Sequence, residues 1–276
     1  MRHCDSQRAW EPEVLPSHSF VVLAYGHSDH LEECLRSLAA QTAPSPVVIS
    51  TSTPFAGIAQ VAERFGARLH LHGPNRGIGP DWNAALEATN CDLVTLVHQD
   101  DLYFPEFAAQ TIEAFVAQPD TSFAFCDSGE VRDDGSPRPL AWNHRIKHWL
   151  VTMATWPTGR VDSSLRRRIL LGFGNPIICA SVTLNRRQRP DFRFSEYLHT
   201  NMDWLAWLQL SARHPVQRIR RRLVDRRVHN NSATSQCISN GTRLVEDRLV
   251  FRQLWPRPAA AVISYAYRLS YSGYDR

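Results

Sequence analysis

The residues best suited to chemistry stand together in the stretch His98-Gln99-Asp100-Asp101. An apolar run rich in β-branched residues, 93–97, comes directly before them, as is typical of a strand buried on both faces of a parallel sheet. Polar side chains at the carboxyl end of such a strand lie where open α/β sheets bind their ligands. Two carboxylates and an imidazole there could hold a divalent cation, and carboxylate oxygens suit Mg²⁺ or Mn²⁺.

An alternative interpretation is that Asp100 and Asp101 cap the next helix. That helix is expected to begin near Pro105, because proline is favoured at the first helical position. Its N-cap would then be Tyr103 or Phe104, so both aspartates stand too early to cap it well. The sequence therefore favours the ligand role.

The elements that must position this stretch alternate between strand and helix patterns in the first half, which indicates an α/β architecture. Strands are expected over 19–25, 47–49, 68–72, 93–97, 122–126, 177–184 and 216–228. Helices are expected over 27–41, 58–65, 81–88, 105–118, 144–156, 163–173, within 195–212, and over 241–255 and 259–269. The strand ends at Tyr25, Ser50 and His98 should converge on one crevice. Gly77 and Gly79 in a neighbouring loop could offer amide groups to phosphate or form a plain turn.

Composition narrows the class of protein. The chain has 276 residues with 43% hydrophobic content, enough for one sizeable core with or without a small second lobe. The formal charge is only +4, which gives no indication of nucleic-acid binding. The six cysteines are scattered without a CxxC pair, as in a reduced, cytosolic protein. Residues 1–18 show no secretory signal, and no apolar run is long enough to span a membrane.

Three motifs in order, STSTP at 50–54, GI followed by DWN at 77–83, and HQDD at 98–101, resemble a bacterial branch of the family 2 glycosyltransferases. The resemblance extends from about Ser19 to the C-terminus. It implies a GT-A fold, an α/β Rossmann-like nucleotide-binding sheet flanked by helices, with a C-terminal acceptor-side helical extension. It also implies three parts: a flexible N-terminal segment (1–18), a nucleotide-sugar-binding half (19–130), and an acceptor-binding half with the C-terminal helices (131–276).

The resemblance also implies roles for single residues. Asp100 is the expected metal ligand with help from Asp101, while His98 replaces the first aspartate of the family's DxD motif. His229 resembles a histidine that completes the metal or diphosphate site in some relatives. Nucleotide-sugar contacts are expected from Ala24, Tyr25, Ser50, Thr51, Asn75, Gly77, Asp81, Asn83 and Gln99. Because Ser50 and Thr51 replace an acidic motif that pairs with the base in the family, the identity of the base stays open.

The expected general base is Asp203. In the family an acidic pair begins a helix of the acceptor half, and Met202-Asp203 stands at that place here. The alternative is a helix-start carboxylate stabilised by the helix dipole. Arg227 and Arg243 could neutralise phosphate, or could belong to a solvated face.

The implied activity is the inverting transfer of a sugar from a nucleotide-diphosphate sugar to a glycan or lipid-linked acceptor, with Mg²⁺ or Mn²⁺ as cofactor, in bacterial cell-surface polysaccharide synthesis. The alternative is a catalytically silent nucleotide- or glycan-binding protein of the same fold, since His98, Ser50 and Thr51 replace acidic positions. The expected location is the cytoplasm, with no nucleic-acid partner. The amphipathic stretch 144–173 could also rest on the inner face of the plasma membrane, although packing on the sheet is the favoured interpretation.

Overall fold

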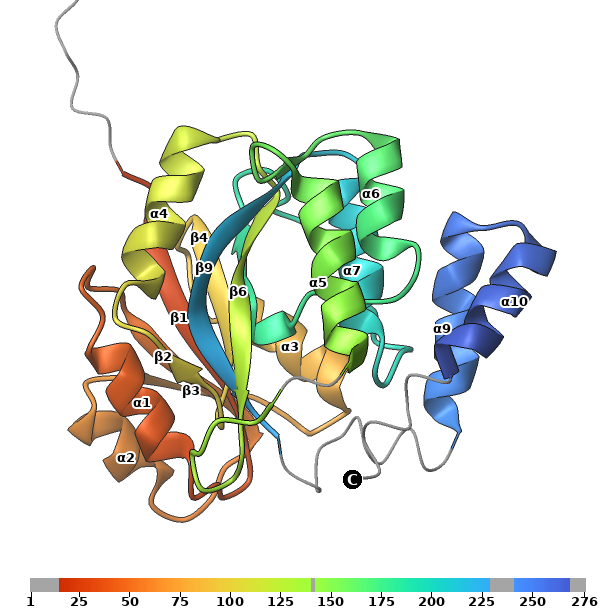
Figure 1. Ribbon diagram of the computed structural model, residues 1–276. Helices are drawn as coiled ribbons and strands as arrows, with labels where there is room; N and C mark the ends of the chain where they lie inside the picture. The colour runs from red at the N-terminus through yellow and green to blue at the C-terminus, as the bar shows by residue number, and fades with distance from the viewer. Residues whose placement is uncertain (1–14, 140–141, 229–240, 269–276) are drawn as a thin grey trace, which may run out of the picture.

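The computed structural model of the protein describes residues 15–139, 142–228 and 241–268. Among these residues, nine strands form a single mixed sheet in the order β3-β2-β1-β4-β8-β6-β9-β5, and β7 pairs with β9 (Figure 1). The strands are β1 (His18–Tyr25), β2 (Val47–Thr53), β3 (Arg68–Leu71), β4 (Leu93–His98), β5 (Leu102–Tyr103), β6 (Phe123–Val131), β7 (Arg160–Val161), β8 (Val182–Asn185) and β9 (Val216–Arg227).

The site end of the sheet is formed by parallel strands. β1 lies between β2 and β4 and is parallel to both, with Leu23 opposite Ser50 on one side and His98 on the other. The predicted meeting of three strand ends is therefore confirmed. β8 is antiparallel to β4 and β6, and β9 is parallel to β6. Strands from both expected halves of the chain thus build one sheet, with β8 inserted beside β4.

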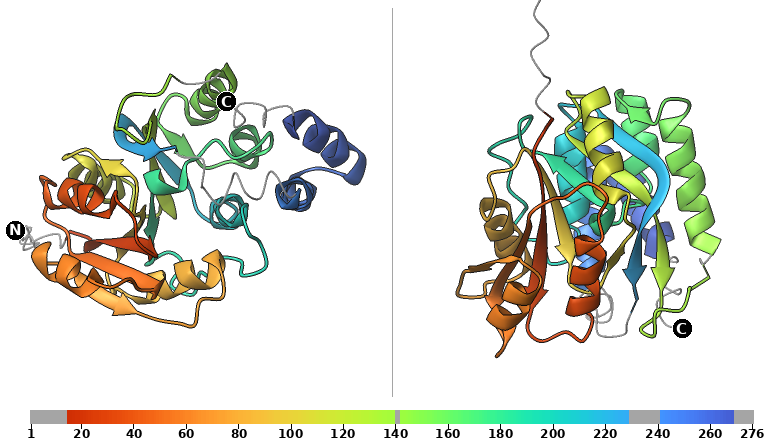
Figure 2. Two further views of the ribbon diagram at one scale, coloured as in Figure 1. Left: turned by 90° about the horizontal axis from the view of Figure 1, so that it is seen from below. Right: turned by 90° about the vertical axis from the view of Figure 1, so that its left-hand side faces the viewer.

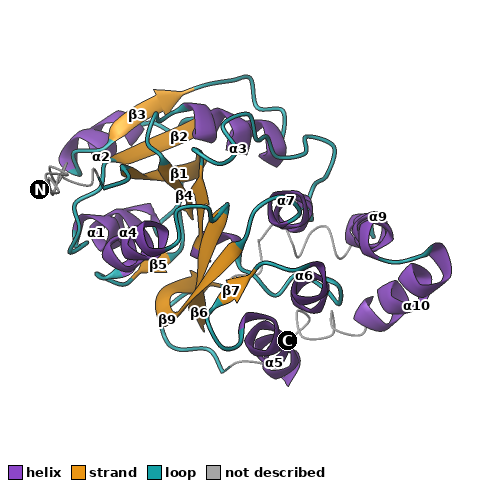
Figure 3. Ribbon diagram, turned by 90° about the horizontal axis from the view of Figure 1, so that it is seen from above, coloured by secondary structure: helices purple, strands orange, loops and turns teal. Residues whose placement is uncertain are grey.

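Helices cover both faces of this sheet. The described helices are α1 (Leu31–Ala39), α2 (Ile58–Arg64), α3 (Ile78–Glu87), α4 (Phe107–Ala117), α5 (Trp142–Thr155), α6 (Ser164–Leu171), α7 (Met202–Ser211), α9 (Thr242–Leu254) and α10 (Arg257–Arg268), with a short 3₁₀ turn η1 (Cys179–Ser181). Figure 3 shows α1 and α4 on one side of the sheet and α3, α5, α6 and α7 on the other. Side chains alternate along a strand, so Phe20 and Val22 join the core under α1, α2 and α4, whereas Val21 joins the opposite core.

The C-terminal helices α9 and α10 lie outside the sheet layers, beside α7 (Figures 1 and 2). An aromatic cluster joins them to α7: the ring centroids of Trp204 and Phe251 are 4.8 Å apart, and those of Phe251 and Tyr267 are 5.7 Å apart. Trp204 is fully buried and donates its indole N–H to Leu171 O at 3.1 Å. The predicted C-terminal helical extension is therefore packed against the helix that carries Asp203.

Several element boundaries differ from the sequence expectation. β5 was not predicted, and it separates Asp101 from α4, which begins at Phe107. α3 begins at Ile78, three residues earlier than expected, because Gly77 already takes the N-cap position. The N-terminal segment, predicted to be flexible over 1–18, lies outside the described residues up to residue 14, but His18 already belongs to β1. None of the described helices is both long and apolar enough to cross a membrane.

Candidate active site

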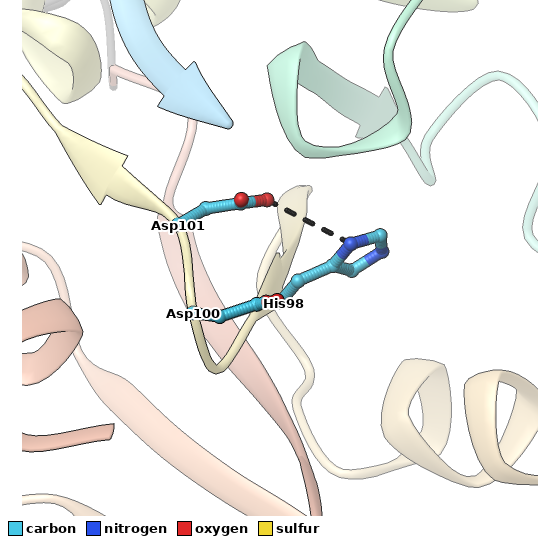
Figure 4. A group of neighbouring side chains, drawn as sticks. All are labelled: His98, Asp100 and Asp101. Carbon is cyan, nitrogen blue, oxygen red and sulfur yellow. Dashed lines mark ion pairs between the residues drawn. The ribbon is translucent and has the colours of Figure 1, made fainter. Parts of the chain in front are cut away.

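The side chains of His98, Asp100 and Asp101 come together in the turn after β4 (Figure 4). Each offers one ligand atom, and these atoms all lie within 4.8 Å of one another. The imidazole of His98 points toward the carboxylate of Asp101, with 3.7 Å between Nδ1 and Oδ2. The structure thus brings together three of the four predicted metal ligands, while His229 lies outside the described residues.

Asp101 is held inside the protein. Its side chain is 1% exposed, and Oδ1 accepts a hydrogen bond from the backbone N–H of Arg227 at 3.0 Å. Oδ2 is buried, and none of the described residues forms a hydrogen bond with it. Burial raises the pKa of Asp101 well above its usual value, and the charge of Asp100 raises it further. The capping alternative fails, because the N-cap of α4 is Glu106, five positions later.

Arg227 braces the same turn. Its guanidinium is buried and donates to the backbone oxygen of Asp100 at 3.2 Å, to those of Arg132 and Asp133 at 3.0 and 2.7 Å, and to Glu33 Oε2 at 2.6 Å. These contacts occupy all three guanidinium nitrogens. The earlier idea that Arg227 neutralises phosphate is therefore wrong: the residue fixes the backbone that presents Asp100.

The donor set fits a divalent cation. Asp101 Oδ2 is buried and has no hydrogen-bond partner among the described residues, which is costly unless another group satisfies it, and the His98 Nδ1 atom faces it at 3.7 Å. Two carboxylates beside one imidazole suit Mn²⁺ well and Mg²⁺ through the oxygens alone. Asp100, Asp101 and His98 are the residues that would hold such an ion.

The end of β1 is tied to this turn by Gln99. Its Oε1 accepts from Tyr25 N at 3.1 Å, and its Nε2 donates to Tyr25 O at 3.2 Å. Tyr25 is itself 64% exposed at the strand end, where its ring can meet a ligand, whereas Ala24 is 4% exposed and belongs to the core. Ala24, Tyr25 and Gln99 were predicted to contact the nucleotide. Of these, Tyr25 is the best placed to do so, and Gln99 holds its backbone through the two hydrogen bonds.

The hydroxyl-rich end of β2 divides into buried and edge residues. Ser50 and Thr51 are 2% and 1% exposed, so their side chains do not reach a ligand in this structure. Ser52 and Thr53 lie nearer the edge: Ser52 Oγ donates to Asp81 Oδ2 at 2.9 Å, and Thr53 Oγ1 accepts from the backbone of the β1–α1 turn at 2.9 Å. The predicted base contact by Ser50 and Thr51 is therefore not supported, and a carboxylate from α3 stands at the end of β2 instead.

The loop before α3 is shaped by local contacts. Asn75 Oδ1 accepts from the N–H of Gly77 at 2.8 Å, and Gly77 has φ +108°, which favours glycine. A Cβ at Gly79 would lie 2.5 Å from Ser195 O, so glycine there permits close approach of the segment before α7. Gly79 thus serves packing between two segments, and Gly77 opens the helix.

Asn83 joins α3 to that same segment. Its Oδ1 accepts from Phe194 N at 2.8 Å, and its Nδ2 donates to Phe194 O and Glu196 Oε1, each at 3.1 Å. Asn83 is 6% exposed, and both ends of its amide are engaged. Asn83 was predicted to contact the nucleotide, but these hydrogen bonds instead hold α3 against the segment that leads into α7.

Asp203 lies in the first turn of α7 and is partly buried. Its Oδ2 accepts from Asn175 Nδ2 at 2.8 Å, and its Oδ1 accepts from Trp204 N at 2.6 Å. Burial raises the pKa of Asp203 to about 6, against the lowering effects of the Trp204 amide, Arg243 and Asn175. A carboxyl group with this pKa is ionised at neutral pH and can still accept a proton, as a general base must. Asn175 was not predicted as a site residue, although Gly174-Asn175-Pro176 marks a break between elements in the sequence.

Cys179 is buried in the turn η1. Burial raises the pKa of its thiol well above the usual value, and the carboxylates of Asp203 and Asp101 raise it further.

Comparison with protein families matches residues 19–189, more than half of the chain, to the family described as "Glycosyl transferase family 2". Comparison with curated proteins found no match.

Solved structures share the fold. The chain covers 71% of S. aureus TarS 1-349 in complex with UDP-GlcNAc (TM-score 0.64, 14% identity, 91% of this chain). It covers 70% of the same protein in complex with UDP (TM-score 0.61, 15% identity, 91% of this chain). It covers 77% of the mannosyltransferase PcManGT from Pyrobaculum calidifontis in complex with GDP-Man and Mn²⁺ (TM-score 0.62, 14% identity, 95% of this chain). These similarities confirm the predicted α/β GT-A fold.

Proposed function

The chain belongs to glycosyltransferase family 2, and from this premise we propose that it transfers a sugar from a nucleotide-diphosphate sugar to an acceptor hydroxyl with inversion at the anomeric carbon. One observation carries the proposal: the ligand atoms of His98, Asp100 and Asp101 lie within 4.8 Å of one another in the turn after β4, at the carboxyl end of a parallel strand. Such a cluster suits the leaving diphosphate, and the transfer also needs a base for the attacking hydroxyl, for which Asp203 on α7 is the candidate.

On the donor side, the side chains of His98, Asp100 and Asp101 would hold a divalent cation. Such an ion would supply positive charge at the departing diphosphate. Arg227 and Gln99 keep the turn in place through the backbone contacts described above. The exposed ring of Tyr25 at the end of β1 packs against the base or the ribose of the donor. A rigid arrangement matters because preorganised groups cost no reorganisation during the reaction.

On the acceptor side, Asp203 takes the proton of the attacking hydroxyl. Asn175 orients one carboxylate oxygen, and the backbone of Trp204 holds the other. With one base and no protein nucleophile assigned, the sugar is displaced once, so its anomeric configuration inverts.

The donor is a nucleoside diphosphate sugar. This class is supported by the solved structures of similar fold, which carry UDP, UDP-GlcNAc or GDP-Man. Asp81, held at the end of β2 by Ser52, supplies a carboxylate near the position where the family motif has an acidic residue. A carboxylate at that place suits a base that offers an N–H on its pairing edge.

The acceptor is a glycan or a lipid-linked glycan, in a pathway of bacterial cell-surface polysaccharide synthesis. Exposed apolar side chains on α5 are the observation that favours a membrane-bound acceptor. Ile146, Trp149 and Met153 on α5 and Trp156 just after it recur at helical spacing and are 49%, 59%, 42% and 64% exposed. Arg220 lies over the Trp156 ring, 5.7 Å from its centroid. Apolar and cationic groups side by side are typical of helices that rest on anionic membranes.

A thermal-shift screen of nucleotide sugars with and without Mn²⁺ tests this proposal. A ligand that binds only the folded protein must raise Tm. We expect at least one nucleotide sugar to raise Tm in the presence of Mn²⁺ and to lose most of that effect without it. Transfer to an acceptor, or slow hydrolysis of the same donor, distinguishes an enzyme from a silent binding protein. No Mn²⁺-dependent shift with any UDP, GDP, dTDP, CDP or ADP sugar contradicts the proposal.

A further inference from the structure

The backbone of the segment that leads into α7 is held by the side chain of Glu246 from α9. The Glu246 carboxylate accepts hydrogen bonds from the backbone N–H groups of His199, Thr200 and Asn201 at 2.6, 2.9 and 3.0 Å, and from Thr200 Oγ1 at 3.1 Å. Glu246 is 4% exposed. Asn201 is the N-cap residue of α7 but makes no capping bond with its own side chain. Glu246 therefore satisfies the amides that precede the helix, two residues before Asp203.

The neighbouring turn of α9 places charge beside the candidate base. Arg243 acts on the carboxylates of both Asp203 and Asp247 and lowers the pKa of each against the effect of burial. Asp247 is fully buried and accepts from Asn201 Nδ2 at 2.7 Å. The first two turns of α9 thus contact the start of α7 through Glu246 and Asp247. Arg243 stands four residues before Asp247, on the same face of the helix.

We propose that helix α9 is the positioning element of the general base: Glu246 fixes the start of α7, and Arg243 holds a positive charge beside Asp203. This inference rests on the proposed role of Asp203 in sugar transfer. It assigns a task to a helix that lies beyond the matched family region, which ends at residue 189.

Two physical effects support this role of α9. A catalytic group must be held within a fraction of an ångström, and small displacements lower turnover strongly. Glu246 and the packing of Phe251 on Trp204 fix the helix that carries Asp203. A buried carboxylate also needs a nearby cation if it is to stay ionised near neutral pH, and Arg243 supplies one.

The surroundings of Asp203 contain further ionisable groups. The carboxylate of Asp203 raises the pKa of the buried Cys179 thiol on η1. Behind Arg243, the pKa of Asp247 is raised to about 6 by burial, lowered by Arg243 and by Lys147 on α5, and raised by Glu246. Arg243 is the cationic side chain among the groups that shift the pKa of Asp203, so we expect loss of its charge to raise that pKa.

The first test follows the Asp203 carboxyl resonance by ¹³C NMR as a function of pH, with the signal assigned by its loss in Asp203→Asn. In Arg243→Gln we expect the midpoint to move upward by roughly one pH unit, because a nearby positive charge favours the ionised form. Arg243→Lys should restore the parental midpoint. Arg248→Gln, on the exposed face of the same helix, is the matched control and should titrate like the parent. A parental midpoint in Arg243→Gln overturns the proposal for this residue.

The second test concerns Glu246→Gln, which can accept through only one oxygen where the carboxylate uses two. We expect the amides of Thr200 and Asn201 to exchange hydrogen at least about tenfold faster, since their hydrogen bonds weaken. Turnover should fall by about 10- to 100-fold while donor affinity stays unchanged. Parental amide exchange and parental turnover in a folded Glu246→Gln protein contradict the positioning role. If this variant does not fold, the Arg243 series still decides the question.

The catalytic role of Asp203 and the positioning role of α9 can fail separately. If Asp203→Asn keeps parental turnover while Arg243→Gln moves the Asp203 midpoint, the catalytic role of Asp203 fails and the electrostatic role of α9 stands. If Asp203→Asn abolishes turnover while neither α9 variant changes the midpoint, the amide exchange or the turnover, the catalytic role stands and the positioning inference fails.

Discussion

At the scale of single residues, Asp100 and Asp101 are chain neighbours with different tasks. Asp101 is almost fully buried and accepts the Arg227 amide, so it stabilises the turn as well as facing the metal site. The backbone oxygen of Asp100 is anchored by Arg227, and its side chain belongs to the same cluster of ligand atoms while being only partly buried. The two residues should therefore respond differently to substitution.

We expect Asp100→Ala to keep the parental Tm within a few degrees and to lose the Mn²⁺-dependent stabilisation by a nucleoside diphosphate. Asp101→Ala should lower Tm clearly, because it leaves the buried Arg227 amide without its acceptor, at a cost of about 1–3 kcal/mol. Differential scanning fluorimetry of both variants, with and without Mn²⁺ and UDP or GDP, checks this. Parental Mn²⁺-dependent binding by Asp100→Ala would exclude it as a ligand.

The pH dependence of turnover should report Asp203. Its pKa is raised mainly by burial, from 3.8 to about 6, and the base works only when ionised. Lowering the pH through about 6 should therefore protonate the base and reduce kcat, whereas kcat should be flat from pH 7 upward until another group titrates. A kcat profile measured with saturating donor and Mn²⁺ checks this. Full turnover at pH 4.5 would show that Asp203 is not the base.

At the scale of elements, the sequence predicted the ends of β1 and β4 well and the side-chain environment poorly. The apolar run before His98 sufficed to locate β4 and its polar end, since alternation and length are local signals. The burial of Ser50, Thr51 and Asn83 depends on partners far away in the chain, such as Phe194, so local pattern could not show it. The same holds for Arg227, whose four acceptors come from three other segments.

The tryptophans of the acceptor half divide in the same way. Trp204 and Trp207 are buried in the core, whereas Trp149 and Trp156 are 59% and 64% exposed. Helical spacing predicts that residues share a face, and it does not say whether another layer covers that face. On α5, part of this face is left uncovered by the described residues.

This exposed stripe leads to a prediction for α5. The parental protein should float with vesicles that contain anionic lipid, less so at high salt, and should not float with purely zwitterionic vesicles. The double variant Trp149→Ser/Met153→Ser should lose most of this binding. Leu165→Ser, a single exposed apolar residue on α6, is the matched control and should behave like the parent. Absence of salt-sensitive flotation by the parent would refute the membrane contact.

At the scale of the whole molecule, the sheet carries the metal cluster, and α7, which carries Asp203, packs on it through Trp207 and Phe123. The sequence indicated an α/β fold with two functional halves, but it could not show that β8, from the second half, lies directly beside β4. Strand order depends on long-range pairing, for example Thr95 opposite Thr183, which leaves no local trace in the sequence. The segment that leads into β8 also carries Asn175, whose side chain donates to Asp203 on α7. The role of α9 in holding α7 was equally invisible, because Glu246 acts 45 residues away from Asn201.

The central claim is that the carboxylates at β4 and α7 divide the work of transfer, with the donor bound at the first and the acceptor activated at the second. Asp203→Asn tests it most directly, because it keeps the size of the side chain and removes the proton acceptor. With turnover, donor affinity and Tm measured on one preparation, we predict a fall in kcat of roughly 10²–10⁴, with donor and Mn²⁺ affinity unchanged. Parental turnover from an Asp203→Asn protein whose Tm alone is altered would contradict the account.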